Sequence, residues 1–198
     1  MSLPEFLLTV ILISLSGVMT PGPLFAVTVA EGRIKPFSGF VISLGHATVE
    51  IPIILSLFLF GSLIISDPVK KTVSLIGGCV LIYFALNEIK CYGKGTKASN
   101  YRGLMAGILM SLFNPYFIIW WFTIGFVLIL NSITFGVLGL LLFIIVHELC
   151  DFLWLGFVSY SSNKTISIWG NKANKVLSAF SISIFLIFGI YFILSAFF

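Results

Sequence analysis

The chain has 198 residues, of which 59% are hydrophobic and only 9% are charged, and its formal net charge is +4. A typical soluble domain is about 45–50% apolar and about 25% charged, so this chain has too few charges to cover a water-exposed surface. Phenylalanine alone contributes 21 residues, which suits lipid-facing surfaces and interfacial belts. The composition therefore predicts an all-α integral membrane protein and excludes an ordinary soluble enzyme.

Basic residues and cysteines carry no sign of a nucleic-acid or metal site. The Lys and Arg residues lie in short connectors between apolar runs, so we expect them to set topology and expect no nucleic-acid partner. Cys79, Cys91 and Cys150 are odd in number and have no CxxC spacing. We therefore expect no disulfide framework, no zinc site and no cofactor.

Six apolar stretches are long enough to cross a bilayer, which takes about 20 residues. In chain order they are approximately Phe6–Ala30, Phe37–Ile65, Val69–Ile89, Leu104–Leu130, Phe135–Tyr160 and Val176–Phe197. Among the separators, only the third, Lys90–Arg102, is long and rich in Gly, Lys and Ser. It predicts a joint between two halves of three helices. The predicted organisation is a first repeat (1–90), a linker (91–102) and a second repeat (103–198).

Proline breaks interrupt the first helix of each half. The first stretch contains Gly17-Val18-Met19-Thr20-Pro21-Gly22-Pro23 near its middle, and the fourth contains Phe113-Asn114-Pro115. Proline removes an amide donor and clashes with the preceding turn, which predicts free carbonyls at Gly17, Met19 and Ser111. A broken helix at membrane depth is tolerated only where it is buried in protein or lines a wet cavity. The residues predicted to bind substrate at the breaks are Thr20, Pro21, Gly22, Pro23, Asn114 and Pro115.

The second helix of each half carries a histidine and an acid at i, i+4 spacing, His46 with Glu50 and His147 with Asp151. Each pair shares one helix face. A charged Asp at a helix centre costs about 2.5–3.5 kcal/mol on insertion scales, so these side chains should face the bundle interior or water. Glu148 lies about 100° around the helix from His147 and need not share that site.

Two halves of three helices, each with a broken first helix and a His/acid pair in its second, predict a repeat. Because three is odd, the halves must have opposite orientations in the membrane. Inverted repeats with discontinuous helices are common among secondary transporters, whose sites lie near the midplane where the halves meet. We therefore expect a transporter of a small molecule, with the membrane lipid as its solvent.

Four motifs together resemble the lysine exporter family of LysE/RhtB-type amino-acid exporters. They are Gly17-x-x-Thr20-Pro21-Gly22-Pro23, Gly45-His46, Phe113-Asn114-Pro115 and Asp151-x-x-Trp154. The likeness covers the whole chain. It implies a six-helix exporter of amino acids or related small metabolites, driven by the proton gradient. Many family members carry a basic residue after the Asn-Pro, where this chain has Tyr116, so the substrate stays open.

Several readings of the polar residues compete. In the leading one, His46, His147 and Asp151 bind substrate, and Glu50 or Asp151 carries a proton as the halves rock. Alternatively, the acids only hold helices together, or the four side chains bind a divalent metal as the exported substrate. An intramembrane hydrolase is the weakest reading, because no HExxH or GxSxG motif is present. An enzyme is not expected, and the sequence leaves open whether the protein works as a monomer or a homodimer.

The tryptophan pair Trp120 and Trp121 shows no chemical motif. We interpret it as an ordinary packing or lipid-facing pair.

Loop charges predict the topology, because cytoplasmic loops are enriched in Lys and Arg. The first, third and fifth loops carry two, four and three basic residues, whereas the second carries two and the fourth none. We expect a multi-pass protein of the cell membrane with both termini outside and the linker in the cytoplasm. A membrane-impermeant thiol reagent tests this: Cys91 should be protected in intact cells and labelled after permeabilisation. Ready labelling in intact cells would contradict the orientation.

Overall fold

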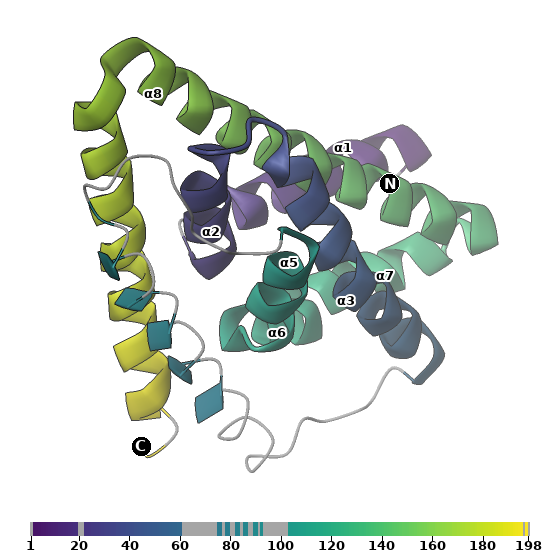
Figure 1. Cartoon of the computed structure of the whole chain (residues 1–198). Helices are drawn as coiled ribbons and strands as arrows, with labels where there is room; N and C mark the ends of the chain where they lie inside the picture. The colour runs from purple at the N-terminus through teal and green to yellow at the C-terminus, as the bar shows by residue number, and fades with distance from the viewer. Residues whose placement is uncertain are drawn as a thin grey trace.

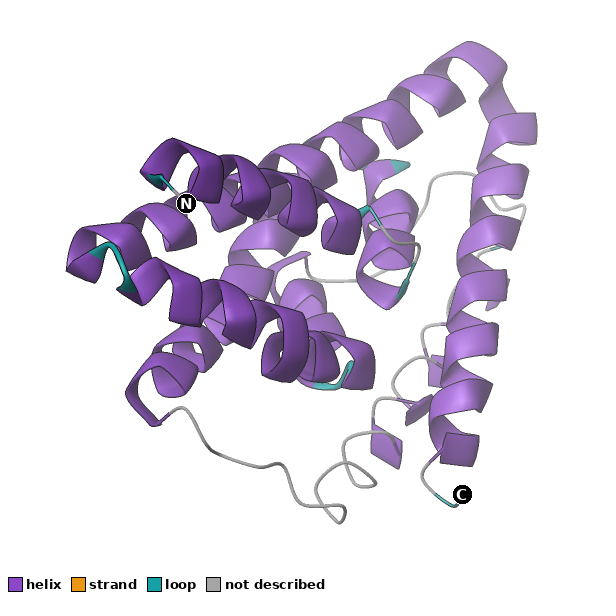
Figure 2. Cartoon of the chain, turned by 180° about the vertical axis from the view of Figure 1, so that it is seen from behind, coloured by secondary structure: helices purple, strands orange, loops and turns teal. Residues whose placement is uncertain are grey.

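The computed structural model describes residues 2–19, 22–60, 103–195 and 197, together with short pieces between residues 75 and 92. These parts of the chain form helices and no strand (Figure 2). Two predicted site residues, Thr20 and Pro21, lie outside the described residues, as does nearly all of the linker.

The predicted break of the first stretch is present. Helix α1 spans Leu3–Val18 and helix α2 spans Pro23–Gly32, and their axes differ by 74°. Helix α1 starts in a capping box, in which the Ser2 amide donates to Oε2 of Glu5 at 2.7 Å. Helix α2 starts at Pro23, where the missing amide costs no helical hydrogen bond.

The fourth stretch is broken as well, into α5 (Gly103–Leu112) and α6 (Pro115–Trp120). It continues as a π-helical segment η1 (Trp121–Gly125) and as α7 (Phe126–Ile133). The Asn114 side chain caps α6 by accepting the Tyr116 amide at 3.1 Å. The carbonyl of Ser111 is not free as predicted, because the chain turns after α5 and the Asn114 amide donates to it at 3.2 Å.

The last two predicted spans form two helical arms that meet at a kink and share the label α8. Helix α8 runs over Gly136–Ser195 and turns at Gly170, where φ is +58°, a conformation that glycine adopts without strain (Figure 1). The sequence predicted a separator over residues 161–175, and the break lies within it, at Gly170; the first arm continues through the polar residues up to that glycine. Side chains in this polar segment bond back along the helix, as Thr165 does to the Ser161 carbonyl at 2.8 Å. Polarity there marks the edge of the apolar span and not the end of the helix.

Length and composition support a membrane protein. Helix α3 spans Ser38–Phe60, and its residues Ser38–Leu59, like Gly136–Ala173 of α8, are long and apolar enough to cross a bilayer. The bent pair of α1 and α2 would make a third span among the described residues. The number of six and the inverted repeat stay predictions.

Glycines bring α3 close to its neighbours α5 and α8. A Cβ at Gly39 of α3 would overlap the backbone carbonyl of Leu155 in α8, and a Cβ at Gly107 of α5 would overlap that of Ile42 in α3. In lipid, helices associate through such small-residue contacts, because there is no difference in apolarity to drive them together. The close approach of α3 and α8 brings their polar faces together.

Replacing Gly39 with alanine tests this packing. The added methyl group must separate α3 from α8, so Gly39→Ala should destabilise the protein by about 1–3 kcal/mol. The control is Gly17→Ala, whose Cβ would meet its nearest neighbour, Nε1 of Trp120, at an ordinary 3.4 Å. Thermal unfolding in detergent measures both variants, and equal melting of Gly39→Ala and the wild type would contradict the packing argument.

Candidate functional site

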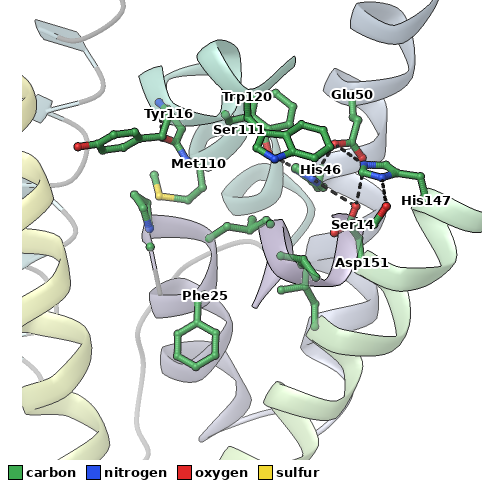
Figure 3. Close-up of a pocket in the computed structure, with 18 of the residues that line it drawn as sticks. Ser14, Phe25, His46, Glu50, Met110, Ser111, Tyr116, Trp120, His147 and Asp151 are labelled. Carbon is green, nitrogen blue, oxygen red and sulfur yellow. Dashed lines mark hydrogen bonds and ion pairs between the residues drawn. The ribbon is translucent and has the colours of Figure 1, made fainter. Parts of the chain in front are cut away.

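Helices α3 and α8 bring the two His/acid pairs into one cluster (Figure 3). Oε1 of Glu50 lies 3.2 Å from Nε2 of His46 and 3.3 Å from Nε2 of His147. Oδ2 of Asp151 lies 3.8 Å from Nε2 of His46 and 3.6 Å from Nε2 of His147. These four side chains form one His/acid cluster, although its two histidines are 101 residues apart along the chain (147 − 46).

The cluster is almost completely buried. His46, Glu50, His147 and Asp151 are each at most 5% exposed. Charged or polar groups at such burial are tolerated only when they bond to one another or to other polar groups. The pairing therefore explains how this chain carries four ionisable side chains in a protein of its composition.

Trp121 belongs to this site, contrary to the interpretation of the tryptophan pair from sequence. Its side chain is fully buried, and Nε1 donates to Oε1 of Glu50 at 3.0 Å. Its ring also meets His147 edge-on, with centroids 5.1 Å apart, and Trp120 stacks on the same imidazole at 5.5 Å. The π-helical turn begins at Trp121, and such turns are frequent at functional sites.

Two serines hold the imidazoles, and sequence reasoning missed both. The Ser14 hydroxyl is 2.7 Å from Nδ1 of His147, and the Ser111 hydroxyl is 2.5 Å from Nδ1 of His46. Each serine lies three residues before a residue of a predicted break: Ser14 before Gly17, and Ser111 before Asn114. A polar residue at that place in an otherwise apolar stretch is the signal that would have found them.

The hydrogen bonds of Ser111 assign the tautomer of His46. The hydroxyl donates to the Gly107 carbonyl at 2.7 Å, so it accepts from Nδ1–H of His46. Nε2 of a neutral His46 then carries no proton, and its 3.2 Å contact with Glu50 needs one proton on either group. The geometry can therefore hold a proton shared between an imidazole and a carboxylate.

The His/acid cluster lies at one end of a cavity of about 500 Å³. Gly22, Pro23 and Asn114, predicted at the two breaks, also line it, and Pro115 begins α6 beside Asn114. Gly22 is the N-cap of α2 and has no capping side chain. The structure thus brings both breaks and both His/acid pairs to one cavity, within the size range of small-molecule sites, about 300–1,000 Å³.

Glu148 lies close to the cluster without lining the cavity. It is not among the described lining residues, but it interacts electrostatically with Glu50, Asp151 and both histidines. Its Oε1 atom is buried and has no hydrogen-bond partner within the described part of the chain.

Comparison with known families decides what kind of protein this is. A family model described as LysE type translocator matches residues 15–196. The chain belongs to the LysE type translocator family. The resemblance expected from the motifs is confirmed, and it makes this protein a membrane transporter of small molecules. Neither the search of curated proteins nor the search of solved structures finds a match.

Three side chains of the translocator lie close enough together to bind one metal ion. His46, Glu50 and Asp151 each offer one ligand atom, and these atoms lie within 4.8 Å of one another. Imidazole and carboxylate are ligands of many divalent metals. The serine bond to His46 Nδ1 orients its Nε2, as outer partners of ligand histidines do.

The hydrogen bond from Trp121 to Glu50 can be removed while an aromatic ring, smaller than the indole, stays in the site. Trp121→Phe keeps a buried aromatic ring but deletes the donor, which leaves a buried carboxylate less satisfied and should cost about 1–3 kcal/mol. Trp169→Phe is the matched control, because Trp169 is 70% exposed. Thermal unfolding in detergent should show a lower midpoint for Trp121→Phe alone. Unchanged midpoints in both variants would remove Trp121 from the site.

Proposed function

We propose that this LysE type translocator exports amino acids or closely related small metabolites by alternating access and couples export to protons. The observation that carries the proposal is the buried His/acid cluster at the end of a cavity whose walls include both helix breaks. Sites of this design, at discontinuous helices between halves of a transporter, hold substrate and coupling ion near the bilayer midplane.

The amino group of a substrate fits the unused acceptors of the cluster. Oε2 of Glu50 and Oδ2 of Asp151 are buried and make no hydrogen bond among the described residues. Buried acceptors without donors are costly, and an ammonium group brings three donors and a positive charge. An ammonium bound there would donate to both oxygens, but we assign its charge to Asp151, whose Oδ2 lies farther from the imidazoles, at 3.6 and 3.8 Å, than Oε1 of Glu50 does, at 3.2 and 3.3 Å. Glu50→Gln would keep an acceptor oxygen for the ammonium.

The carboxylate of the substrate fits the start of α2. Gly22 lines the cavity and is the N-cap of the ten-residue helix α2, and it has no side chain that could cap the helix. A helix N-terminus carries a partial positive charge and attracts anions. The cavity thus offers carboxylates at the cluster for the ammonium of an amino acid and the start of α2 for its carboxylate.

Proton coupling rests on the shared proton of His46 and Glu50 and on the second carboxylate, Asp151. When an ammonium binds, the carboxylates favour their charged form and release a proton. When the substrate leaves, an unpaired buried carboxylate is unfavourable and takes a proton up again. If the two events face opposite sides of the membrane, as alternating access provides, proton entry drives substrate exit.

A second candidate function is export of a divalent metal ion, favoured by the ligand atoms of His46, Glu50 and Asp151. Counterflow in proteoliposomes separates the two. One arm follows radiolabelled amino acids with and without an imposed pH gradient, and the other follows Mn²⁺ or Zn²⁺ with an enclosed metal-sensitive dye. We expect amino-acid counterflow that a pH gradient accelerates and no metal flux. Metal flux without amino-acid counterflow would replace the proposal with the second candidate.

Neutral analogues of the two acids should separate proton transport from substrate binding. Glu50→Gln keeps size and hydrogen bonding but stays neutral, so we expect it to abolish pH-driven net export and to spare exchange without a gradient. Asp151→Asn should weaken both activities, because Asp151 is assigned to the substrate ammonium. Glu5→Gln, at the exposed start of α1, is the control, since glutamine also completes a capping box. Wild-type, pH-dependent export by Glu50→Gln would show that Glu50 is structural.

A further inference from the structure

The cavity has a charged end and an apolar end. In Figure 3 the His/acid cluster and Ser14 lie together at one side, whereas Met110 and Tyr116 lie at the other and Phe25 lies farther along the wall. Among the described residues that line the cavity, none is Lys or Arg, and the only acids are Glu50 and Asp151 of the cluster. Beyond the cluster, the described part of the wall therefore offers a substrate no charged side chain.

We propose that the exported substrate is an amino acid with a large apolar side chain, of the size of leucine, methionine or phenylalanine. The inference rests on the proposed function, which places the ammonium at the cluster. The rest of the molecule then extends toward Met110 and Phe25. Apolar surface placed there leaves water for an apolar wall, which favours binding in proportion to the area covered.

Met110 lies at the apolar end of the cavity. It is 2% exposed in the described part of the chain, lines the cavity, and belongs to a buried cluster with Ala26 and Leu155. Leu24 and Phe25 pack against this cluster from the start of α2. Methionine is flexible and polarisable, so it can adapt to apolar side chains of different shape. The wall is therefore suited to several large apolar side chains.

The same wall disfavours charged side chains. The second ammonium of lysine would lie at the apolar end without a carboxylate, or would compete with the α-amino group for the one pair of acids. The side-chain carboxylate of glutamate would likewise find no cation there. Burying an unpaired charge is far more costly than burying a neutral group. A small polar side chain such as that of serine avoids this cost but gains little apolar contact.

Competition for counterflow tests the proposal with the wild-type protein. Proteoliposomes take up radiolabelled L-leucine against internal unlabelled leucine, and external leucine, methionine, phenylalanine, serine, lysine and glutamate compete. We expect half-inhibition by the three apolar amino acids at concentrations at least ten times lower than by the other three. Leucinol, which lacks the carboxylate, should compete at least ten times less well than leucine.

A matched pair of variants tests the assignment to Met110. Met110→Gln adds an amide to the apolar end and should reduce the preference for leucine over serine at least fivefold, whereas Met110→Leu should retain it. Met105→Gln is the control on the same helix, because Met105 is 48% exposed and is not among the described lining residues. Size-exclusion profiles in detergent confirm that each variant is folded.

The outcomes separate this inference from the function on which it rests. To detect amino acids other than leucine, each of the six is also used as the labelled substrate. Counterflow with lysine, glutamate or serine as the best substrate would overturn the apolar side-chain proposal and leave amino-acid export standing. Counterflow with none of the six would refute the proposed function itself. An unchanged preference in Met110→Gln would also overturn the assignment of the apolar end.

Discussion

The structure depends on one constraint, the need to satisfy two carboxylates and two imidazoles inside an apolar bundle. His46, Glu50, His147 and Asp151 are each only 2–5% exposed, so they pair with one another. Oε2 of Glu50 and Oδ2 of Asp151 make no hydrogen bond among the described residues, and the cavity that the four side chains line is where a partner for these oxygens would bind. That requirement brings polar faces of α3 and α8 together, and the glycine contacts between these helices make the distance short enough. The indole of Trp121 donates a further hydrogen bond to Oε1 of Glu50, the carboxylate oxygen that also contacts both imidazoles.

The broken helices are tied to this cluster crosswise. Ser14, on α1, hydrogen-bonds to His147 of α8, and Ser111, on α5, hydrogen-bonds to His46 of α3. A shift of either broken helix must therefore lengthen or remake a bond to an imidazole. These links couple the positions of the two broken helices to the geometry of the cluster.

Two sequence-based expectations were wrong, and both failed for a physical reason. The carbonyl of Ser111 was expected to be free because Pro115 has no amide, but the turn before the proline offers the Asn114 amide in its place. Trp120 and Trp121 were interpreted as packing or lipid-facing residues. In an apolar stretch every aromatic residue looks alike, and only the π-helical turn at Trp121 directs its indole to Glu50.

The sequence by itself determined the solvent, the two breaks and the pairing of each histidine with an acid. These follow from composition, from proline chemistry and from the periodicity of the helix, all of which are local. Only the tertiary structure decided that the two pairs form one cluster and that Ser14, Ser111 and Trp121 hold it. The reason is distance along the chain: these bonds join residues 133, 65 and 71 positions apart, and no local pattern encodes which helix faces which.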